Sequence, residues 1–218
     1  GFRRKIKRVL HLSTQSIKEI GMAFILIAYN NDTSAELHEF MELCGDNVMQ
    51  YCYDKQIEYT QLTPPYLTEH EMMSQMEEHH ICFIAGHGDD DGIYNETDED
   101  VISTRTTNYN FQGKALYCVS CCSAVNLCPS LMQIGLKLYV GYNDTFEVKG
   151  DYSPFLQSAL SGLKCLLDGD DAKTAKEKMN QIYDEQIDIL NQENPWAAVC
   201  LLHNKEALVF QGDENYSI

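Results

Sequence analysis

Two short apolar segments of this 218-residue chain each end at a residue that could take part in nucleophilic chemistry. In residues 80–88 an apolar run ends in His87 between two glycines, and in residues 115–124 a second run ends in Cys121 and a Ser-Ala pair. A thiol becomes an effective nucleophile when a neighbouring imidazole accepts its proton. If both runs are parallel strands of one sheet, their carboxyl ends meet at the same edge. We therefore expect a catalytic dyad of Cys121 and His87.

The residues next to the dyad suit the same chemistry. Gly86 would let the backbone turn at the end of its strand, and Gly88 would leave an N–H free to bind the oxyanion of a substrate carbonyl. His87 would accept the thiol proton and later donate it to the leaving amine. We also expect a helix to start directly after Cys121, so that the helix N-terminus stabilises the thiolate.

Buried strands and helices must alternate along the chain to position these residues. Besides the two segments above, apolar runs predict strands over residues 22–28, 57–62 and 137–141. The sequence Thr68-Glu69-His70-Glu71 is a capping box and predicts the start of a helix. Further helices are expected from about residue 35 to 44, over 45–56 after an interruption near Gly45, just after Cys121, and over 154–167 and 172–190.

The sequence also predicts one long acidic loop and one β-hairpin. Residues 89–100 are acidic and contain glycine, so we expect them to form a loop, followed by a polar segment up to Gly113. Residues 197–202 and 207–210 are apolar runs joined by a polar turn, which predicts a closing β-hairpin.

The alternation predicts one α/β domain over residues 21–218, with a mainly parallel central sheet and helices on both faces. Residues 1–20 are expected to be a basic N-terminal arm or linker. They contain the cluster Arg3, Arg4, Lys5, Lys7 and Arg8.

Composition excludes several classes of function. The net charge of −17 argues against a nucleic-acid partner and against anionic membranes, and it is compatible with basic protein or peptide substrates. No apolar segment approaches the ~18 residues of a membrane-spanning helix. The nine cysteines come without a recognisable secretion signal, so we expect reduced thiols in a cytoplasmic protein.

The two motifs together resemble those of the caspase-like cysteine peptidases, a superfamily that includes metacaspases, separases, gingipains and the bacterial CHAT proteins. Ala85-Gly86-His87-Gly88 is similar to the histidine motif, and Ser120-Cys121-Cys122-Ser123-Ala124 to the cysteine motif. The order of the predicted strands extends the resemblance over roughly residues 20–210, but its specific part is these two blocks. The resemblance implies an oxyanion hole formed by the backbone of Gly88 and of Cys121.

The sequence leaves two candidates for the nucleophile. Cys121 fits the family pattern of a small residue, Cys, any residue, Ser or Thr, and Gly or Ala, whereas Cys122 also follows a small residue. We favour Cys121.

The substrate pocket is where the chain departs from the family. In metacaspase-like and clostripain-like members, an aspartate two residues before the nucleophile binds a basic P1 side chain, whereas this chain has Val119 there. Either P1 is not basic, or another acid supplies the charge. Asp144 and Glu147 are candidates for such substrate-binding residues, and residues 89–91 are a second option. All of these acids could instead be solvated loop residues. The only arginine near the motifs is Arg105, which argues against acidic P1 side chains.

Other kinds of site are weaker. The aspartate-rich residues 89–91 and 96–100 contain oxygen ligands that would suit Ca²⁺, but their spacing does not match an EF-hand, and we expect no metal and no cofactor. Cys118 and Cys121 form a C-x-x-C pattern that begins inside a strand, which suits neither redox chemistry nor zinc.

The sequence thus favours a cysteine endopeptidase that makes limited cuts in a protein substrate. From the resemblance alone we expect a bacterial defence or cell-death role, with an activating partner or parent complex. The competing hypothesis is a catalytically idle caspase-like scaffold used for protein binding or dimerisation.

Overall fold

The computed structural model describes residues 24–106 and 108–218. Its central element is a six-stranded sheet in the order β2-β1-β3-β7-β8-β9, in which only the edge strand β9 runs antiparallel to its neighbour. The strands in this order are Glu58–Leu62, Phe24–Tyr29, Ile81–Ala85, Ala115–Val119, Leu138–Tyr142 and Leu208–Gly212. The expected α/β fold with a mainly parallel sheet is confirmed.

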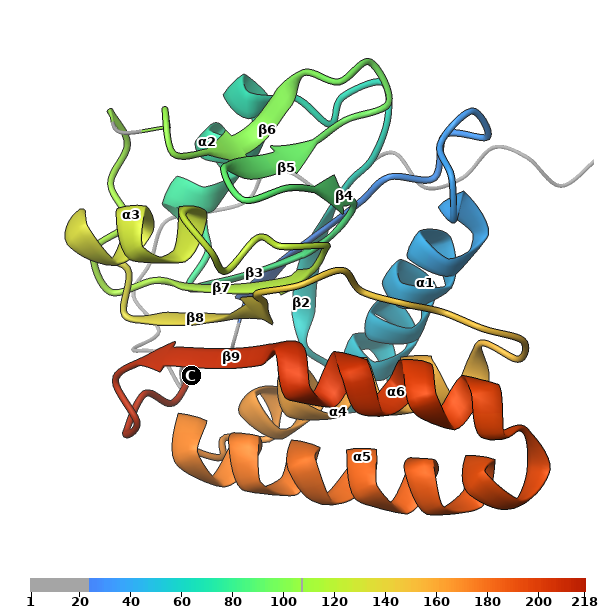
Figure 1. The fold of residues 1–218 in the computed structure, drawn as a ribbon. Coiled ribbons are helices and arrows are strands. Elements are labelled where there is room, and N and C mark those ends of the chain that lie inside the picture. Colours follow the sequence, from blue (N-terminus) through green and yellow to red (C-terminus); the bar gives the residue numbers. More distant parts are fainter. Residues whose placement is uncertain (1–23, 107) are drawn as a thin grey trace, which may run out of the picture.

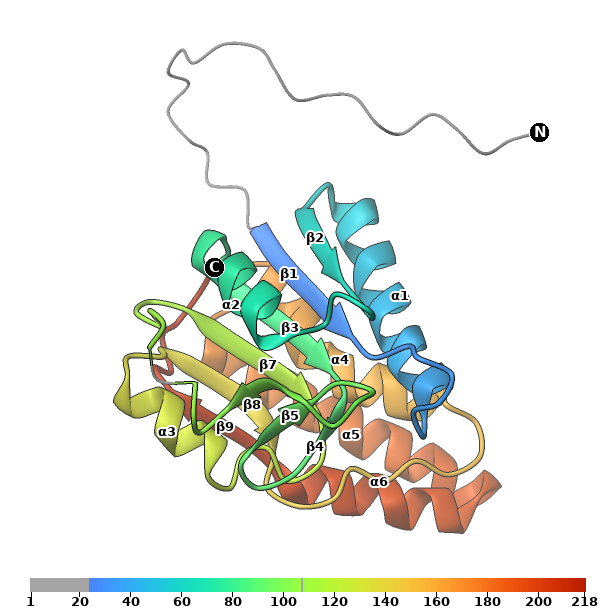
Figure 2. The same cartoon turned by 90° about the horizontal axis from the view of Figure 1, so that it is seen from above.

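Helices cover both faces of the sheet, as expected (Figures 1 and 2). One face packs against α1 (His38–Lys55), α4 (Ser153–Leu167), α5 (Ala172–Glu193) and α6 (Pro195–Ala207). The other face packs against α2 (Glu69–Glu78) and α3 (Leu127–Gln133). The side chains of β3 alternate between the two cores, with Phe83 and Ala85 towards α1 and α4, and Cys82 and Ile84 towards α2 and α3.

The capping box is present at the start of α2, where the Thr68 hydroxyl accepts the N–H of Glu71 at 3.3 Å. The expected interruption near residue 45 is wrong, because α1 runs without a break from His38 to Lys55. Gly45 lies inside this helix where a Cβ would come within 2.4 Å of two atoms of the Tyr29 ring. The glycine therefore lets the helix approach β1 closely and does not end it.

Two predictions of irregular or β structure are corrected. Residues 87–103 do not form a plain loop but a three-stranded antiparallel sheet of β4 (His87–Gly88), β5 (Gly92–Tyr94) and β6 (Asp100–Ser103). Ile93, Val101 and Ile102 of this small sheet are buried against the α2 side of the core. Short strands within an acidic segment gave no alternating pattern long enough to recognise.

The closing hairpin is also wrong, because its first half is the helix α6. Asn194 caps this helix by accepting the N–H of Ala197 at 3.3 Å, and Pro195 takes its first position. Only the second half is a strand, β9, which pairs with β8. The predicted basic arm, residues 1–20, lies outside the described residues. In the described chain, no helix is both long and apolar enough to cross a membrane.

Candidate active site

The two sequence motifs follow neighbouring parallel strands at the same edge of the sheet. Ala85 at the end of β3 pairs with Val119 at the end of β7, and the N–H of Gly86 donates to the Val119 carbonyl at 3.3 Å. His87 and Cys121 each come two residues after this pair, and both are half-buried. The fold therefore brings the imidazole-bearing and thiol-bearing segments together at the carboxyl edge of the sheet, as predicted.

Gly88 lies directly against the cysteine motif. A Cβ on Gly88 would lie 2.2 Å from the Ser120 hydroxyl and 3.0 Å from the carbonyl oxygen of Cys121. Neither Gly86 nor Gly88 has a positive φ, so left-handed backbone conformation is not what requires glycine here. The requirement at Gly88 is space, because any side chain would collide with the segment that carries the thiol.

The N–H of Gly88 is left out of the β4–β5 ladder. Asp89 donates its N–H to the carbonyl of Gly92 at 3.0 Å, which makes these two residues a hydrogen-bonded pair. Directly opposed residues in an antiparallel ladder alternate, so the next pair, Gly88 and Ile93, does not exchange ladder hydrogen bonds. This geometry agrees with the expected role of Gly88 as an oxyanion donor.

Cys121 packs on the α1 and α4 side of the sheet and accepts a hydrogen bond through its sulfur from the N–H of Phe146, at 3.3 Å. The expected helix directly after Cys121 is absent, because residues 121–126 form turns and α3 begins only at Leu127. No helix therefore starts at this thiol, and a backbone N–H from a distant segment contacts it instead.

Cys122 is held in a strained backbone conformation with φ of 53°. Its N–H donates to the carbonyl of Asp144 at 2.9 Å, which fixes this turn. Burial raises the pKa of the Cys122 thiol, and the neighbouring Cys121 and the carboxylates of Asp90, Asp144 and Asp89 raise it further. The thiolate of Cys122 is thus disfavoured.

The two candidate substrate-binding acids point to different neighbours. Asp144 lies beside Cys122, together with Asp89 and Asp90. Glu147 instead joins α6: its backbone hydrogen bonds with Asn204, and after burial its carboxylate is the next cause that raises the pKa of the Cys200 thiol. The structure therefore brings Asp144 to the cysteine motif with residues 89–90 and leaves Glu147 turned towards α6.

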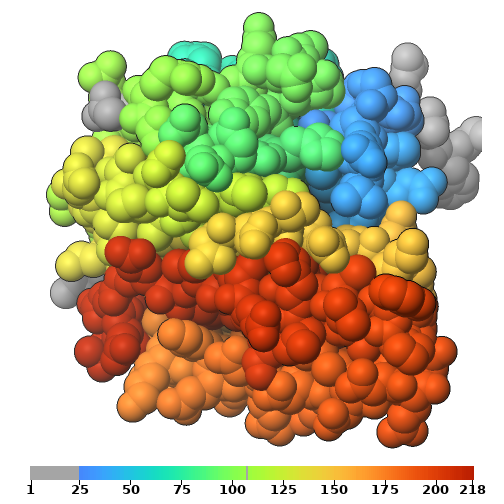
Figure 3. Space-filling model, in the orientation of Figure 1, coloured from blue at the N-terminus to red at the C-terminus, as the bar shows by residue number. Residues whose placement is uncertain are grey.

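The segment that carries Asp144 crosses the surface between α6 and the β4–β6 sheet (gold in Figure 3). Its Phe146 ring packs edge-on against Tyr142, with centroids 4.7 Å apart, and stacks on Phe40 at 5.7 Å. On its other side, His203 and Asn204 of α6 hydrogen bond with its backbone. No sequence signal pointed to Phe146 or Asn204, because their roles depend on contacts between distant parts of the chain.

Arg105 and the cysteines other than Cys121 and Cys122 lie outside the two motifs. Cys118 and Cys121 pack on opposite sides of the sheet, as expected for the C-x-x-C pattern of a strand. Arg105 is engaged in a two-pronged ion pair with Asp100, at 2.6 and 2.7 Å. All nine cysteines are free thiols. No group of three or more His, Cys, Asp or Glu residues in the described chain is arranged to hold a metal ion.

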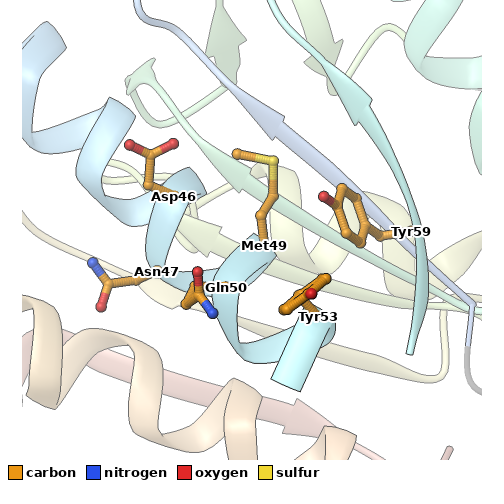
Figure 4. A pocket seen from close by; sticks show the side chains of 6 residues that line it. All are labelled: Asp46, Asn47, Met49, Gln50, Tyr53 and Tyr59. Carbon is orange, nitrogen blue, oxygen red and sulfur yellow. The ribbon is translucent and has the colours of Figure 1, made fainter. Parts of the chain in front are cut away.

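A hollow of about 640 Å³ lies away from the two motifs, between α1 and the edge strand β2 (Figure 4). It is lined by Asp46, Asn47, Met49, Gln50, Tyr53 and Tyr59. None of these residues belongs to the His87 or Cys121 segment, so this hollow is not part of the candidate site.

In comparisons with known proteins, no family model matches this chain, and no curated protein matches it.

Proposed function

We propose that this chain is a caspase-like cysteine endopeptidase in which Cys121 and His87 form the catalytic dyad. One arrangement carries the proposal: the two motifs follow adjacent parallel strands in register, and Gly88 lies against the Ser120 hydroxyl and the carbonyl of Cys121. A scaffold would need neither a histidine and a thiol at one sheet edge nor a glycine packed against the cysteine segment.

The proposed reaction assigns a role to Cys121, His87 and Gly88. The Cys121 sulfur forms a bond to the scissile carbonyl carbon while its proton passes to His87, and the N–H of Gly88 stabilises the resulting oxyanion. Collapse of this intermediate breaks the C–N bond, and His87 gives the proton to the leaving amine. Water, deprotonated by His87, then hydrolyses the thioester and releases the second product and the free thiol.

A basic P1 side chain fits the charges beside the cysteine motif. Asp144, Asp89 and Asp90 all act electrostatically on the thiol next to the nucleophile, and their negative charge would attract a basic P1 side chain. They would take the role of the aspartate that metacaspase-like peptidases have two residues before the nucleophile, where this chain has Val119. We assign P1 recognition to Asp144 and not to Glu147, because Glu147 is held to α6 through Asn204 and does not act on the cysteine motif.

The test is covalent labelling by irreversible peptidyl inhibitors that differ at P1, followed by intact-mass measurement. We expect one-to-one labelling by inhibitors with Lys or Arg at P1. Labelling should disappear in Cys121→Ala, slow in His87→Ala and persist in Cys122→Ala. Labelling that follows Cys122 would move the nucleophile by one residue.

The idle scaffold is the alternative outcome of the same experiment. If no inhibitor labels the wild-type chain at any P1, while iodoacetamide still alkylates Cys121, the thiol is accessible but the peptidase assignment is wrong. Size-exclusion chromatography of the same sample would then test the dimerisation role of a scaffold.

A further inference from the structure

The segment that contacts the Cys121 sulfur is anchored by one buried side chain of α6. Asn204 is fully buried, and its side-chain amide makes two hydrogen bonds to the backbone of Glu147. The carbonyl oxygen Oδ1 accepts the N–H of Glu147 at 2.8 Å, and Nδ2 donates to the carbonyl of Glu147 at 2.7 Å. An amide that satisfies both backbone groups of one residue fixes that residue in position and in orientation.

Glu147 is the residue directly after the donor to the nucleophile. The N–H of Phe146 donates to the Cys121 sulfur at 3.3 Å, and the Phe146 ring is held between Phe40 and Tyr142. The preceding residue is held as well, because His203 Nε2 hydrogen bonds with the carbonyl of Thr145 at 3.0 Å. The Phe146 N–H is therefore aimed at the sulfur by contacts on both sides of it along the chain.

We propose that Asn204 is a positioning residue for the nucleophile: it holds Glu147 so that the Phe146 N–H stays on the Cys121 sulfur. This proposal rests on the proposed function, because it matters for catalysis only if Cys121 attacks a substrate. The sulfur carries negative charge when it attacks, and a hydrogen bond to a charged group is stronger than one between neutral groups. Asn204 touches neither substrate nor sulfur and acts through the backbone of the segment.

The chain offers a matched control at Asn95. This asparagine is also buried, accepts the N–H groups of Thr97 and Glu99 at 3.0 Å, and donates to the carbonyl of Leu67 at 3.2 Å. It anchors the turn between β5 and β6 and not the segment over Cys121. Replacing either asparagine by alanine removes the same chemical groups from a buried backbone anchor, so a general loss of stability should appear in both variants.

The experiment measures the rate of alkylation of Cys121 by iodoacetamide, resolved from other cysteines by peptide mass mapping in a Cys122→Ala background. We expect Asn204→Ala to slow this reaction about ten-fold, the effect of losing one hydrogen bond to a charged sulfur. We expect Asn95→Ala to leave the rate unchanged, since the two sites share no partners. With a peptide substrate, Asn204→Ala should lower kcat more than it raises KM.

Each result separates the two proposals. An unchanged Cys121 rate in folded Asn204→Ala, or an equal decrease in Asn95→Ala, overturns the role of Asn204. If Asn204→Ala slows alkylation of Cys121 but no peptidyl inhibitor labels the wild-type chain, the role of Asn204 is supported. The peptidase assignment is then overturned. If Asn204→Ala does not fold, His203→Ala removes only the contact to Thr145 and should slow alkylation by a smaller factor; no change there also overturns the proposal.

Discussion

Gly88 is the position in the candidate site that leaves the least room for a side chain. A Cβ there would lie 2.2 Å from the Ser120 hydroxyl and 2.9 Å from the carbonyl of Gly92, so the backbone would have to move. The displaced group is the proposed oxyanion donor. Because losing one such donor lowers kcat by about 100-fold to 1,000-fold, we expect Gly88→Ala to lower peptidase activity by about that factor.

Gly86→Ala is the matched control for this prediction. Its added Cβ would meet the Ile93 side chain at 3.3 Å and the Tyr94 carbonyl at 3.6 Å, contacts that a small shift can accommodate. Steady-state kinetics of the two variants should therefore differ by more than ten-fold. Equal activities would show that Gly88 has no special place in the site.

Cys122 offers a prediction that does not depend on peptidase activity. Burial, Cys121 and three carboxylates raise the pKa of its thiol. Neutralising one of these carboxylates in Asp90→Asn removes an unfavourable interaction with the thiolate, so the pKa should fall and Cys122 should react faster with iodoacetamide near pH 8. Asp188→Asn, on the exposed surface of α5, serves as the charge-matched control and should leave the rate unchanged.

At the scale of elements, the β4–β5 turn depends on one carboxylate. Burial opposes ionisation of Asp89, but hydrogen bonds from the Tyr94 hydroxyl and from the N–H groups of Asp91 and Gly92 outweigh it and lower the pKa of this carboxyl. Burial, together with the same hydrogen bond to Asp89, raises the pKa of Tyr94 to about 12. The pair therefore holds the small sheet that carries His87 and Gly88.

The lowered pKa of Asp89 makes the stability of the protein depend on pH. A carboxyl whose pKa is lowered on folding stabilises the protein above its unfolded value near 3.9, and this stability is lost as the pH falls through the folded value. We expect Tyr94→Phe to lower the free energy of unfolding by about 0.5–1 kcal/mol at neutral pH, a small value because Asp89 is exposed. Denaturant unfolding should show this difference shrinking below pH 4, whereas Tyr53→Phe, on exposed α1 surface, should show none at any pH. A difference that grows in acid would contradict the assignment.

The sequence predicted those elements that produce a regular local pattern. The buried runs of β1, β3, β7 and β8 and the capped helix α2 were recognised because every residue of a central strand is apolar and because Thr68 and Glu71 have a fixed spacing. The two catalytic candidates followed from the ends of these strands. Strand order in a parallel sheet then brought them to one edge.

The parts that were missed depend on contacts that local sequence does not encode. The run 197–202 is apolar enough for a strand, but Ala197, Ala198 and Leu201 pack at helical spacing against α5, and the cap at Asn194 starts the helix. The small sheet β4–β6 has strands of two to four residues, too short for a period to be seen. Asn204 and Phe146 meet the site only because β8 and α6 bring their segments together.

At the scale of the whole molecule, charge is distributed very unevenly. Residues 24–218 contain 32 of the 33 acidic residues but only 10 of the 16 basic ones. Four of those basic side chains form ion pairs with aspartates: Lys55, Arg105, Lys178 and Lys205. The body of the protein is therefore strongly anionic, and at the candidate site Asp89, Asp90 and Asp144 add to this potential.

Such a field predicts that ionic strength controls substrate capture. A cationic peptide should be attracted over a distance set by the Debye length, which falls from about 30 Å at 0.01 M salt to about 10 Å at 0.1 M. We expect kcat/KM for a peptide with several Lys or Arg residues to fall at least about ten-fold over this range, mainly through KM. A peptide of the same length with Lys or Arg at P1 and a net charge of zero isolates the P1 contact from this long-range effect and should lose much less. If both peptides respond equally to salt, the anionic body does not guide substrates, and the acidic residues serve only local recognition at Asp144 and its neighbours.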